Sequence, residues 1–539
     1  MAGHYERLSH LDASFFALES STSHMHVAGL AIFETGPLAT PDGGVDIDVI
    51  RDFVSAKLHL IPRYRQRLAH LPIEQTPVWV DDEHFNIHYH VRHTSLPRPG
   101  GHEQLLALMG RLASQPLDRA KPLWEIWIVE GLAEDRFALI SKTHHAMIDG
   151  VSGVDLMTVL LSLAPSTWIG EPPPFKPRTV PNGTELMVRE TARRIGSAVA
   201  TVTSLHRLVS DAQVIAMSGV RRVRAVGYSL ASGWLTQASS TPLNGRIGPN
   251  RRFATMETDL AEVKAVKNAL GGSVNDVVLA TVAGGVRRYL TAHELDPTDL
   301  DFRVMAPVSV RSQEQRGSLG NQVAMWLVPL PVGEPDPARR LAAVHDETER
   351  LKRTDQALGA STLARLSAGA PLTLVSLASR LASNARPFNM TVTNVPGPQF
   401  PLYLLGSRLV ATYPLVPLWQ GHGAGIALFS YEGTLFWGFN ADWDIVADLD
   451  RLVASMEDSF RELVTVAARG ATTRMPATPK RRPPIGGAPV PKAASRAKTA
   501  PAETAASSGK APTAKTVGGK TAAGKAAAAK AAGGSGAVG

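Results

Sequence analysis

The chain has 539 residues, 44% of them hydrophobic, which is more than one hydrophobic core usually organises, so at least two domains are expected. It contains no cysteine, which excludes a disulfide framework, a thiolate zinc site and a cysteine nucleophile. The net charge is +8, but residues 471–539 alone hold twelve Lys or Arg and one acid, a balance of +11 that leaves −3 for residues 1–470.

Residues 1–163 are expected to form a mixed α/β domain. Runs typical of strands cover His26 to Glu34, Leu123 to Gly131 and Arg136 to His144, and helical patterns cover 47–60, 103–114 and 153–163. The third strand leads directly into two histidines. The first residues lack the charged start and apolar run of a signal peptide, so we expect a protein that stays inside the cell.

Residues 164–249 are expected to separate two domains. Six prolines between Pro165 and Pro181 cannot sustain a helix or a central strand. Residues 184–238 then have a helical pattern with interleaved arginines. Such a helix either lies in a membrane or lipid-droplet interface or serves as a solvated linker, and the second reading is preferred because surface arginines are common.

Residues 250–470 are expected to form a second α/β domain. Helices are predicted at 260–270, 275–293, 337–358 and 448–468, and strands at 302–310, 322–331, 389–394, 425–431 and 434–440. The uncharged stretch from Leu409 to Tyr431 is broken by prolines and glycines, so no transmembrane segment is predicted. Two α/β halves suggest a substrate site between them.

The tail, residues 471–539, is dominated by Ala, Lys, Pro, Thr and Gly. It has too few bulky apolar residues to offset the entropy of ordering and is expected to be disordered. Its lysines either bind anionic membrane or nucleic acid non-specifically or merely keep the chain soluble.

The segment from His144 to Gly150 is the strongest chemical signal. Strand alternation predicts that His144 and His145 point to opposite faces. Acyl transfer to an alcohol requires removal of the hydroxyl proton, and an imidazole suits that task. Asp149 is expected to fix the loop geometry, and Gly150 to allow a tight turn.

Other readings of the histidine pair have less support. A metal site would need further ligands, and no compact cluster supplies them. A purely structural pair remains an alternative for the segment taken alone. The HExxH and GxSxG patterns are absent, so neither a zinc protease nor a serine hydrolase is indicated.

At these residues the sequence resembles the HHxxxDG acyltransferases, and other stretches select the bacterial wax ester synthase/diacylglycerol acyltransferases among them. Motifs similar to that family follow in its order over residues 5–468. They are Leu8 to Phe16 with His24 to Val27, Pro122-Leu123-Trp124, Thr241 to Arg252, Ser273 to Asp276, Pro307 to Arg311 with Gly320-Asn321, and Thr393 to Pro398. The DFGWG-type motif of the plant relatives is missing, which leaves the CoA contacts unassigned.

The resemblance implies two chloramphenicol-acetyltransferase-like domains with the active site in a tunnel between them. It also implies an acyl-CoA donor, and a diacylglycerol or long-chain alcohol as acceptor. His145 would be the proton acceptor and His144 a supporting residue. No cofactor is implied, because acyl-CoA is a substrate. Oxyanion donors are expected in the second domain; the candidates are Asn275, Ser309, Thr393 and Asn394.

Several of these residues have a structural alternative. Asn275 could be a helix N-cap, and Asn394 could belong to a turn. Trp124 and Trp326 are candidates for an acyl channel, although core packing is preferred. CoA phosphates favour arginines, and the candidates, for all of which solvated surface is the default interpretation, are Arg287, Arg288, Arg311 and Arg316.

The expected function is triacylglycerol or wax ester synthesis at the inner face of the membrane or at lipid droplets, with no specific nucleic acid partner. One alternative is an acyltransferase of the condensation-domain type that uses a carrier protein, although no carrier domain is present in the chain. Another is a non-catalytic lipid-surface protein. The acceptor cannot be read from the sequence, because a hydrocarbon pocket discriminates weakly between similar chains.

Overall fold

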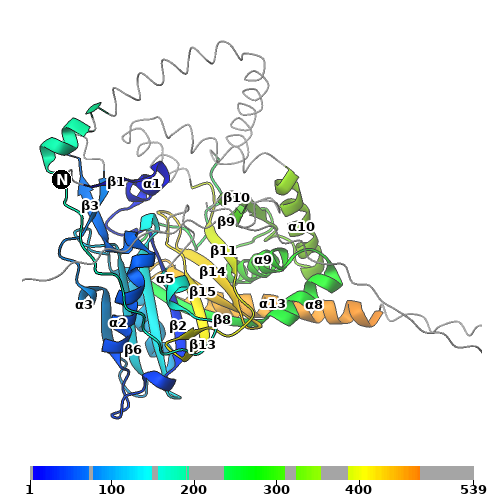
Figure 1. Ribbon diagram of the computed structural model, residues 1–539. Coiled ribbons are helices and arrows are strands. Elements are labelled where there is room, and N and C mark those ends of the chain that lie inside the picture. The colour runs from blue at the N-terminus through cyan, green and yellow to red at the C-terminus, as the bar shows by residue number, and fades with distance from the viewer. Residues whose placement is uncertain are drawn as a thin grey trace, which may run out of the picture. The chain divides into compact units, whose positions relative to one another are not determined.

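The computed structural model describes residues 4–71, 77–147, 156–189, 191–192, 236–309, 323–353 and 386–473 (Figure 1). All of them belong to one unit, Met1–Met475. Most of the predicted basic helical segment, the remainder of the helix predicted at 337–358, and the tail from residue 474 onward lie outside the described residues. Residues 471–473, predicted as the start of a disordered tail, instead continue the helix that precedes them.

The first six-stranded sheet has the order β12-β13-β2-β7-β6-β5. Its strands are β2 (His26–Glu34), β5 (Val91–Ser95), β6 (Trp124–Leu132), β7 (Arg136–His144), β12 (Tyr403–Leu404) and β13 (Ser407–Leu415). Neighbouring strands are antiparallel except β5 and β6, which are parallel. Two strands from the C-terminal part of the chain therefore complete a sheet that is otherwise N-terminal.

Helices pack against this sheet and form the first core with it. They are α2 (Ile47–Lys57), α4 (His102–Ser114) and the short α3 (Ile87–His90) and α5 (Leu156–Leu160). The Asp46 side chain accepts the N–H of Val49 and caps α2, whose Ile50, Phe53 and Val54 are buried at helical spacing. Short 3-10 turns, η1 (Gly36–Leu38), η2 (Leu58–Leu60) and η3 (Pro62–Arg65), link these elements.

A small sheet of order β1-β4-β3 lies in the same half of the chain. It consists of β1 (Glu6–Arg7), β3 (Gln66–His70) and β4 (Pro77–Asp81). Arg178 of the proline-rich segment forms a bidentate pair with Asp81 of β4, at 2.7 and 2.9 Å. This pair attaches the extended segment, which has no helix or strand between 165 and 181, to the folded domain.

The second six-stranded sheet has the order β10-β9-β11-β14-β15-β8. Its strands are β8 (Arg251–Asp259), β9 (Phe302–Ser309), β10 (Val323–Leu330), β11 (Met390–Pro396), β14 (Ala424–Tyr431) and β15 (Thr434–Asp442). β11 runs parallel to both β9 and β14, and the other neighbouring pairs are antiparallel.

The helices α8 (Leu260–Leu270), α9 (Val274–Ala292), α10 (Pro337–Arg353) and α13 (Leu449–Thr473) pack with this sheet (Figure 1). Together they form the second core. Within the described ranges no single helix is both long and apolar enough to cross a membrane. The pair α8 and α9, bent by 94°, meets that criterion jointly by length and composition only, and most of α9 is buried in the core.

The predicted elements agree closely with the structure where they can be compared. The strands at 26–34 and 136–144 and the helix at 260–270 have the predicted bounds, and the mixed α/β class is confirmed. The strands β1, β3, β4, β5, β8 and β12 were not predicted. The helix predicted at 153–163 ends at Leu160, because Ser162 pairs with Tyr403 instead. The uncharged stretch 409–431 contains the end of β13, all of β14 and a connection between them, which confirms strands and turns there.

Close contact between the two sheets depends on Gly438 in β15. A Cβ at this position would lie 1.9 Å from the carbonyl oxygen of Pro414 in β13. Only glycine allows the two strands to approach so closely.

Gly438→Ala should therefore lower the free energy of unfolding by about 1–3 kcal/mol, the usual cost of overpacking. Gly29→Ala in β2 is the matched control, because its Cβ would meet nothing closer than the Ser141 hydroxyl at 3.5 Å. Denaturant unfolding of both variants measures the difference. Equal stability of the two would show that β13 and β15 do not need this contact.

Candidate active site

The two histidines lie where β7 ends. His144 is the last residue of β7 and pairs in register with His26 of β2, and their rings meet edge to face with centroids 5.8 Å apart. His145 begins the 3-10 turn η4 (His145–Met147). Because the backbone leaves the strand at this point, the alternation used to predict opposite faces does not extend to His145.

The helix α1 (His10–Leu18) covers both imidazole rings. Phe15 stacks on His145 with ring centroids 4.0 Å apart, and Phe16 stacks on His144 at 4.2 Å. Ser9 caps the N-terminus of the helix, and its side chain accepts the N–H of Asp12. Two adjacent aromatic residues of α1 thus each pack against one of the two imidazole rings.

Glu19 holds His144 from the end of α1. Its side chain is 6% exposed, and its Oε1 lies 3.2 Å from His144 Nε2. The N–H of Ala146 donates to His144 Nδ1 at 3.1 Å, so Nδ1 is the acceptor and Nε2 carries the proton that faces the carboxylate. The contact to Glu19 is close, although the angle at Nε2 is not that of a good hydrogen bond.

The Glu19 carboxylate has further partners. The Met25 N–H donates to Oε1 at 2.8 Å, and Arg119 binds Oε2. Burial alone would raise the pKa of Glu19, but the close contact with the His144 ring N–H, together with the hydrogen bond from the Met25 N–H, outweighs burial and lowers the pKa to about 2. Glu19 is therefore a buried anion throughout the physiological range.

His145 lies in a drier setting. Burial lowers the pKa of its imidazole to about 4, although its own main-chain carbonyl acts in the opposite direction. Nδ1 is enclosed and has no hydrogen-bond partner of good geometry among the described residues. The His145 N–H donates to the Met25 carbonyl at 2.8 Å. The ring is therefore neutral at pH 7, as a proton acceptor must be.

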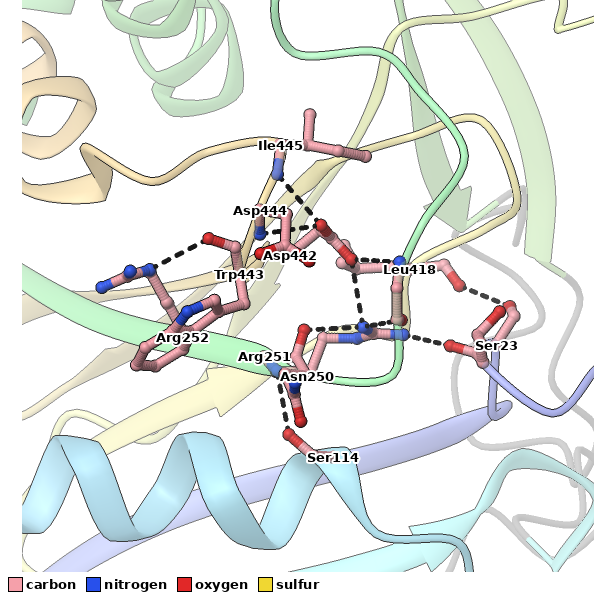
Figure 2. A network of polar contacts seen from close by, with 12 residues as sticks. Ser23, Ser114, Asn250, Arg251, Arg252, Leu418, Asp442, Trp443, Asp444 and Ile445 are labelled. Atoms are coloured by element: carbon pink, nitrogen blue, oxygen red, sulfur yellow. Dashed lines mark hydrogen bonds and ion pairs between the residues drawn. The ribbon is translucent and has the colours of Figure 1, made fainter.

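Arg251 ties this region to the second sheet (Figure 2). Its guanidinium donates to the Gly248 carbonyl at 2.7 Å and pairs with Asp442 at 3.4 Å, and it also donates to the Thr22 carbonyl. Ser23 Oγ donates to the Leu418 carbonyl at 2.8 Å. The segment between Glu19 and Met25 is thus anchored to both halves of the chain.

Two cavities adjoin Arg251. A narrow one of about 10 Å³ is lined by His24, His26, Lys142 and Arg251, among others. A wider one of about 1000 Å³ lies between α4 and the beginning of β8, and Arg251 lines it as well. Arg251 therefore stands between a large open space and the enclosed space beside His26.

Asn275 and Asp276 have distinct positions at the start of α9. The N-cap is Ser273, which forms a capping box with Asp276, so the suggested N-cap role of Asn275 is wrong. The reason is that the helix begins at Val274, one residue earlier than the sequence pattern indicated. Asp276 is buried and also bonds His345 and Thr348, at 2.9 and 2.7 Å. Asn275 is half-buried.

Thr393 and Asn394 lie on β11 opposite Ala427 and Leu428 of β14, and both are half-buried. Asn394 is thus within the strand, two residues before its end, and the suggested turn role is wrong for this residue. The predicted site residues Asp149 and Arg311, and also Arg316, lie outside the described residues. Ser309 ends β9, but its side chain is not described.

The aromatic and basic candidates have structural partners. Trp124 is fully buried, donates to the Tyr64 carbonyl at 2.8 Å and stacks on His90, and Trp326 lies in the second core. Both are thus core residues, the preferred reading. Arg287 donates to the carbonyls of Val332 and Gly333, and Arg288 pairs with Glu462.

Sequence reasoning missed the contacts of Glu19, because nothing in its local pattern shows that Arg119 and His144, a hundred or more residues away, are among its partners. Phe15 and Phe16 belong to a recognised motif, but their contacts with the histidines were not foreseen. Within the described part of the chain, no group of three or more His, Asp or Glu residues is arranged to hold a metal ion.

Comparison with known proteins defines the class. Residues 8–278 match the wax ester synthase/diacylglycerol acyltransferase catalytic domain, and residues 319–464 match the C-terminal domain of the same family. The chain is 31% identical over 471 residues to a Mycobacterium tuberculosis protein named probable diacylglycerol O-acyltransferase tgs1, covering 87% of this chain and 97% of that protein. It is 34% identical over 461 residues to tgs2 of the same species, covering 84% and 97%.

Comparison with solved structures leads to the same family. The wax ester synthase/diacylglycerol acyltransferase from Marinobacter aquaeolei VT8 matches with a TM-score of 0.60 and 27% identity, covering 86% of this chain and all of that one. The first condensation domain of the calcium-dependent antibiotic synthetase shares the fold, with a TM-score of 0.51, 15% identity and coverage of 87% and 98%. The chain belongs to the wax ester synthase/diacylglycerol acyltransferase family, and it is an acyltransferase of that family.

The buried Glu19 carboxylate should give stability a specific pH dependence. Its pKa is about 2 in the folded protein against 4.5 for an ordinary glutamate. Because the folded pKa is the lower one, the stabilisation is complete above pH 4.5 and is lost as the pH falls towards 2. It amounts to about 3 kcal/mol.

Denaturant unfolding of wild type and Glu19→Gln between pH 6 and pH 2 measures this effect. The stability advantage of wild type should shrink by about that amount as the pH falls. Glu262→Gln, on the exposed face of α8, is the control and should show no such change. Parallel pH curves for wild type and Glu19→Gln would contradict the assignment.

Proposed function

We propose that the protein transfers a fatty acyl group from acyl-CoA to the free hydroxyl of diacylglycerol, with long-chain alcohol as a second acceptor, and that His145 is the catalytic base. The observation that carries the proposal is the neutral His145 imidazole, stacked on Phe15 at the end of β7. Membership of the family and the names of the mycobacterial relatives support the choice of diacylglycerol.

The reaction proceeds in one direct transfer. As the acceptor oxygen attacks the thioester carbonyl carbon, His145 takes the hydroxyl proton. Nδ1 of the ring is enclosed, which leaves Nε2 as the nitrogen that accepts it. The tetrahedral intermediate then collapses, the carbon–sulfur bond breaks, and the imidazolium returns the proton to the departing thiolate. The products are the new ester and CoA.

His144 and Glu19 act as positioning residues in this scheme. The Glu19 carboxylate faces the Nε2 proton of His144, and the rigid pair fixes the turn from which His145 projects. Asp149 is assigned the role of organising the loop that follows.

The oxyanion of the intermediate needs preorganised donors. Asn275 at the start of α9 and Asn394 on β11 are the proposed donors. Thr393 on β11 and Ser309 at the end of the adjacent parallel strand β9 are further candidates. Arg311 is proposed to contact the CoA phosphates. These residues all come from the C-terminal half, so both halves would contribute to one reaction.

The protein is proposed to act peripherally at a membrane or lipid-droplet surface, because both the acceptor and the product are lipids. Exposed apolar side chains support this proposal: Trp168 is 72% exposed and Leu163 is 71% exposed, both near the proline-rich segment. Exposed apolar side chains of this kind can insert into the apolar layer of a lipid surface, which would hold the protein there.

The function is tested by supplying purified full-length protein with labelled acyl-CoA and either dioleoylglycerol or hexadecanol, and by identifying the ester formed. Labelled triacylglycerol is the expected main product, with a smaller amount of wax ester. Wax ester alone would replace diacylglycerol with alcohol as the acceptor. No ester from either acceptor would overturn the proposed activity.

The role of His145 is tested by His145→Ala. Loss of general-base catalysis should lower the rate by about 10²- to 10⁴-fold, while the thermal unfolding midpoint stays close to that of wild type. His59→Ala, on the exposed side of the first domain, is the matched control. Wild-type turnover by His145→Ala would contradict the proposed mechanism.

A further inference from the structure

A third cavity, with a polar lining, opens beside the segment from Glu19 to Met25, which contacts the two histidines. Its volume is about 590 Å³, and its lining includes Ser20, Thr22, Arg246, Arg386, Gln420 and Gly421, which we call the arginine pocket. No acidic residue is among the described residues that line it. A cavity with two guanidinium groups and no carboxylate carries a local positive charge.

The charge of Arg386 is not neutralised within the described part of the chain. Its guanidinium donates to the Ser240 hydroxyl at 3.2 Å and to the Ala238 carbonyl at 3.0 Å, which are both neutral groups. Its Nε is buried and has no partner among those residues. Burial accordingly lowers the pKa of Arg386, and a bound anion would relieve this cost.

The hydroxyl of Ser20 is arranged to donate into the pocket. Its oxygen already accepts three N–H groups, from Gln420 Nε2 at 3.0 Å, from Ser23 at 3.0 Å and from Thr22 at 3.3 Å. A hydroxyl oxygen has two lone pairs, so no acceptor capacity remains. Among the described residues, the acceptor recorded for its hydrogen is the Thr22 hydroxyl, 3.5 Å away. That distance is too long for a good O–H···O bond.

The loop that carries Ser20 and Thr22 is rigidly placed. Arg251 binds the Thr22 carbonyl, and Ser23 is buried against Leu418 (Figure 2). Gln420 Nε2 also donates to Thr22 Oγ1 at 3.0 Å. The donors of the loop are thus fixed before any ligand binds, which lowers the entropy cost of binding.

Several fixed donors around a positive cavity match a phosphate group, which presents three oxygens and a full negative charge. A carboxylate presents only two oxygens, and the volume of about 590 Å³ leaves room for a ligand larger than one phosphate. We propose that the arginine pocket binds the phosphate group of a larger ligand. The chemistry fits either the nucleotide of the CoA donor, which rests on the proposed function, or an anionic phospholipid headgroup, which does not.

The position of the pocket links it to the reaction. Glu19, which directly precedes Ser20, contacts His144, and Met25, at the other end of the same segment, accepts the N–H of His145. A phosphate held at this segment would therefore anchor its ligand next to the histidines. Binding there would fix the donor or the membrane surface relative to His145.

The test compares wild type with Arg246→Gln and with Arg246→Gln/Arg386→Gln in binding, independently of turnover. Arg246 is exposed, so its single variant is expected to fold normally. Arg461→Gln, whose side chain pairs with Glu457 and Asp458 on α13, is the control. The probes are CoA, phosphate-free pantetheine, and phosphatidylcholine vesicles with or without phosphatidic acid.

Loss of charge-assisted hydrogen bonds should raise the dissociation constant of the phosphate-bearing probe by about 10- to 100-fold in the double variant and leave pantetheine and the control unaffected. Weakened CoA binding alone identifies the nucleotide, and weakened binding to phosphatidic acid vesicles alone identifies the headgroup. Unchanged affinity for both, or no affinity of wild type for either, overturns the inference. Ester formation by wild type with acyl-CoA, measured separately, shows whether the proposed function survives that result.

Discussion

The contact between Glu19 and His144 is the interaction on which the site depends. Glu19 lies just after α1, and His144 ends β7, so this pair fixes the helix to the end of the strand. The segment from Glu19 to Met25 makes further contacts. Arg251 donates to its Thr22 carbonyl, and the His145 N–H donates to its Met25 carbonyl. The segment from Glu19 to Met25 therefore contacts both histidines and also Arg251, which belongs to the C-terminal half of the chain.

Burial favours the neutral form of both ionisable groups of this centre, yet the two groups have different charge states. Glu19 keeps its charge because cationic and N–H partners surround it, whereas His145 lacks such partners and stays neutral. The stacked rings of Phe15 and Phe16 contribute by excluding water. Their surroundings thus leave the Glu19 carboxylate charged and the imidazole of His145, the proposed proton acceptor, neutral, a common way to assign roles to nearby titratable residues.

The sequence predicted the elements with a strong local period. β2, β7 and α8 have alternating or helical patterns that are read correctly from a few residues. The pairing of β13 with β2 could not be predicted, because it joins Leu409 to Phe33 and no local signal specifies so distant a partner. The start of α9 was misplaced because Ser273 and Asn275 are both good capping residues. The domain boundaries at 163 and 249 stay predictions.

The histidine pair itself was predicted, but its environment was not. A motif identifies His145 as a candidate base, yet neither the Phe15 stack nor the anion at Glu19 can be inferred from spacing. Likewise, Trp124 is part of a recognised motif, and only the structure shows that its indole is enclosed in the core. Burial and remote partners determine how each motif residue acts, and both depend on tertiary packing.

The pH dependence of kcat/KM for acyl transfer tests the central claim, that His145 acts as a neutral base whose pKa is lowered by burial. The account predicts a nearly constant value from pH 8 to about pH 5, followed by a fall centred near pH 4, where the imidazole of the free enzyme becomes protonated. A fall centred near 6.5, the ordinary value for histidine, would contradict it.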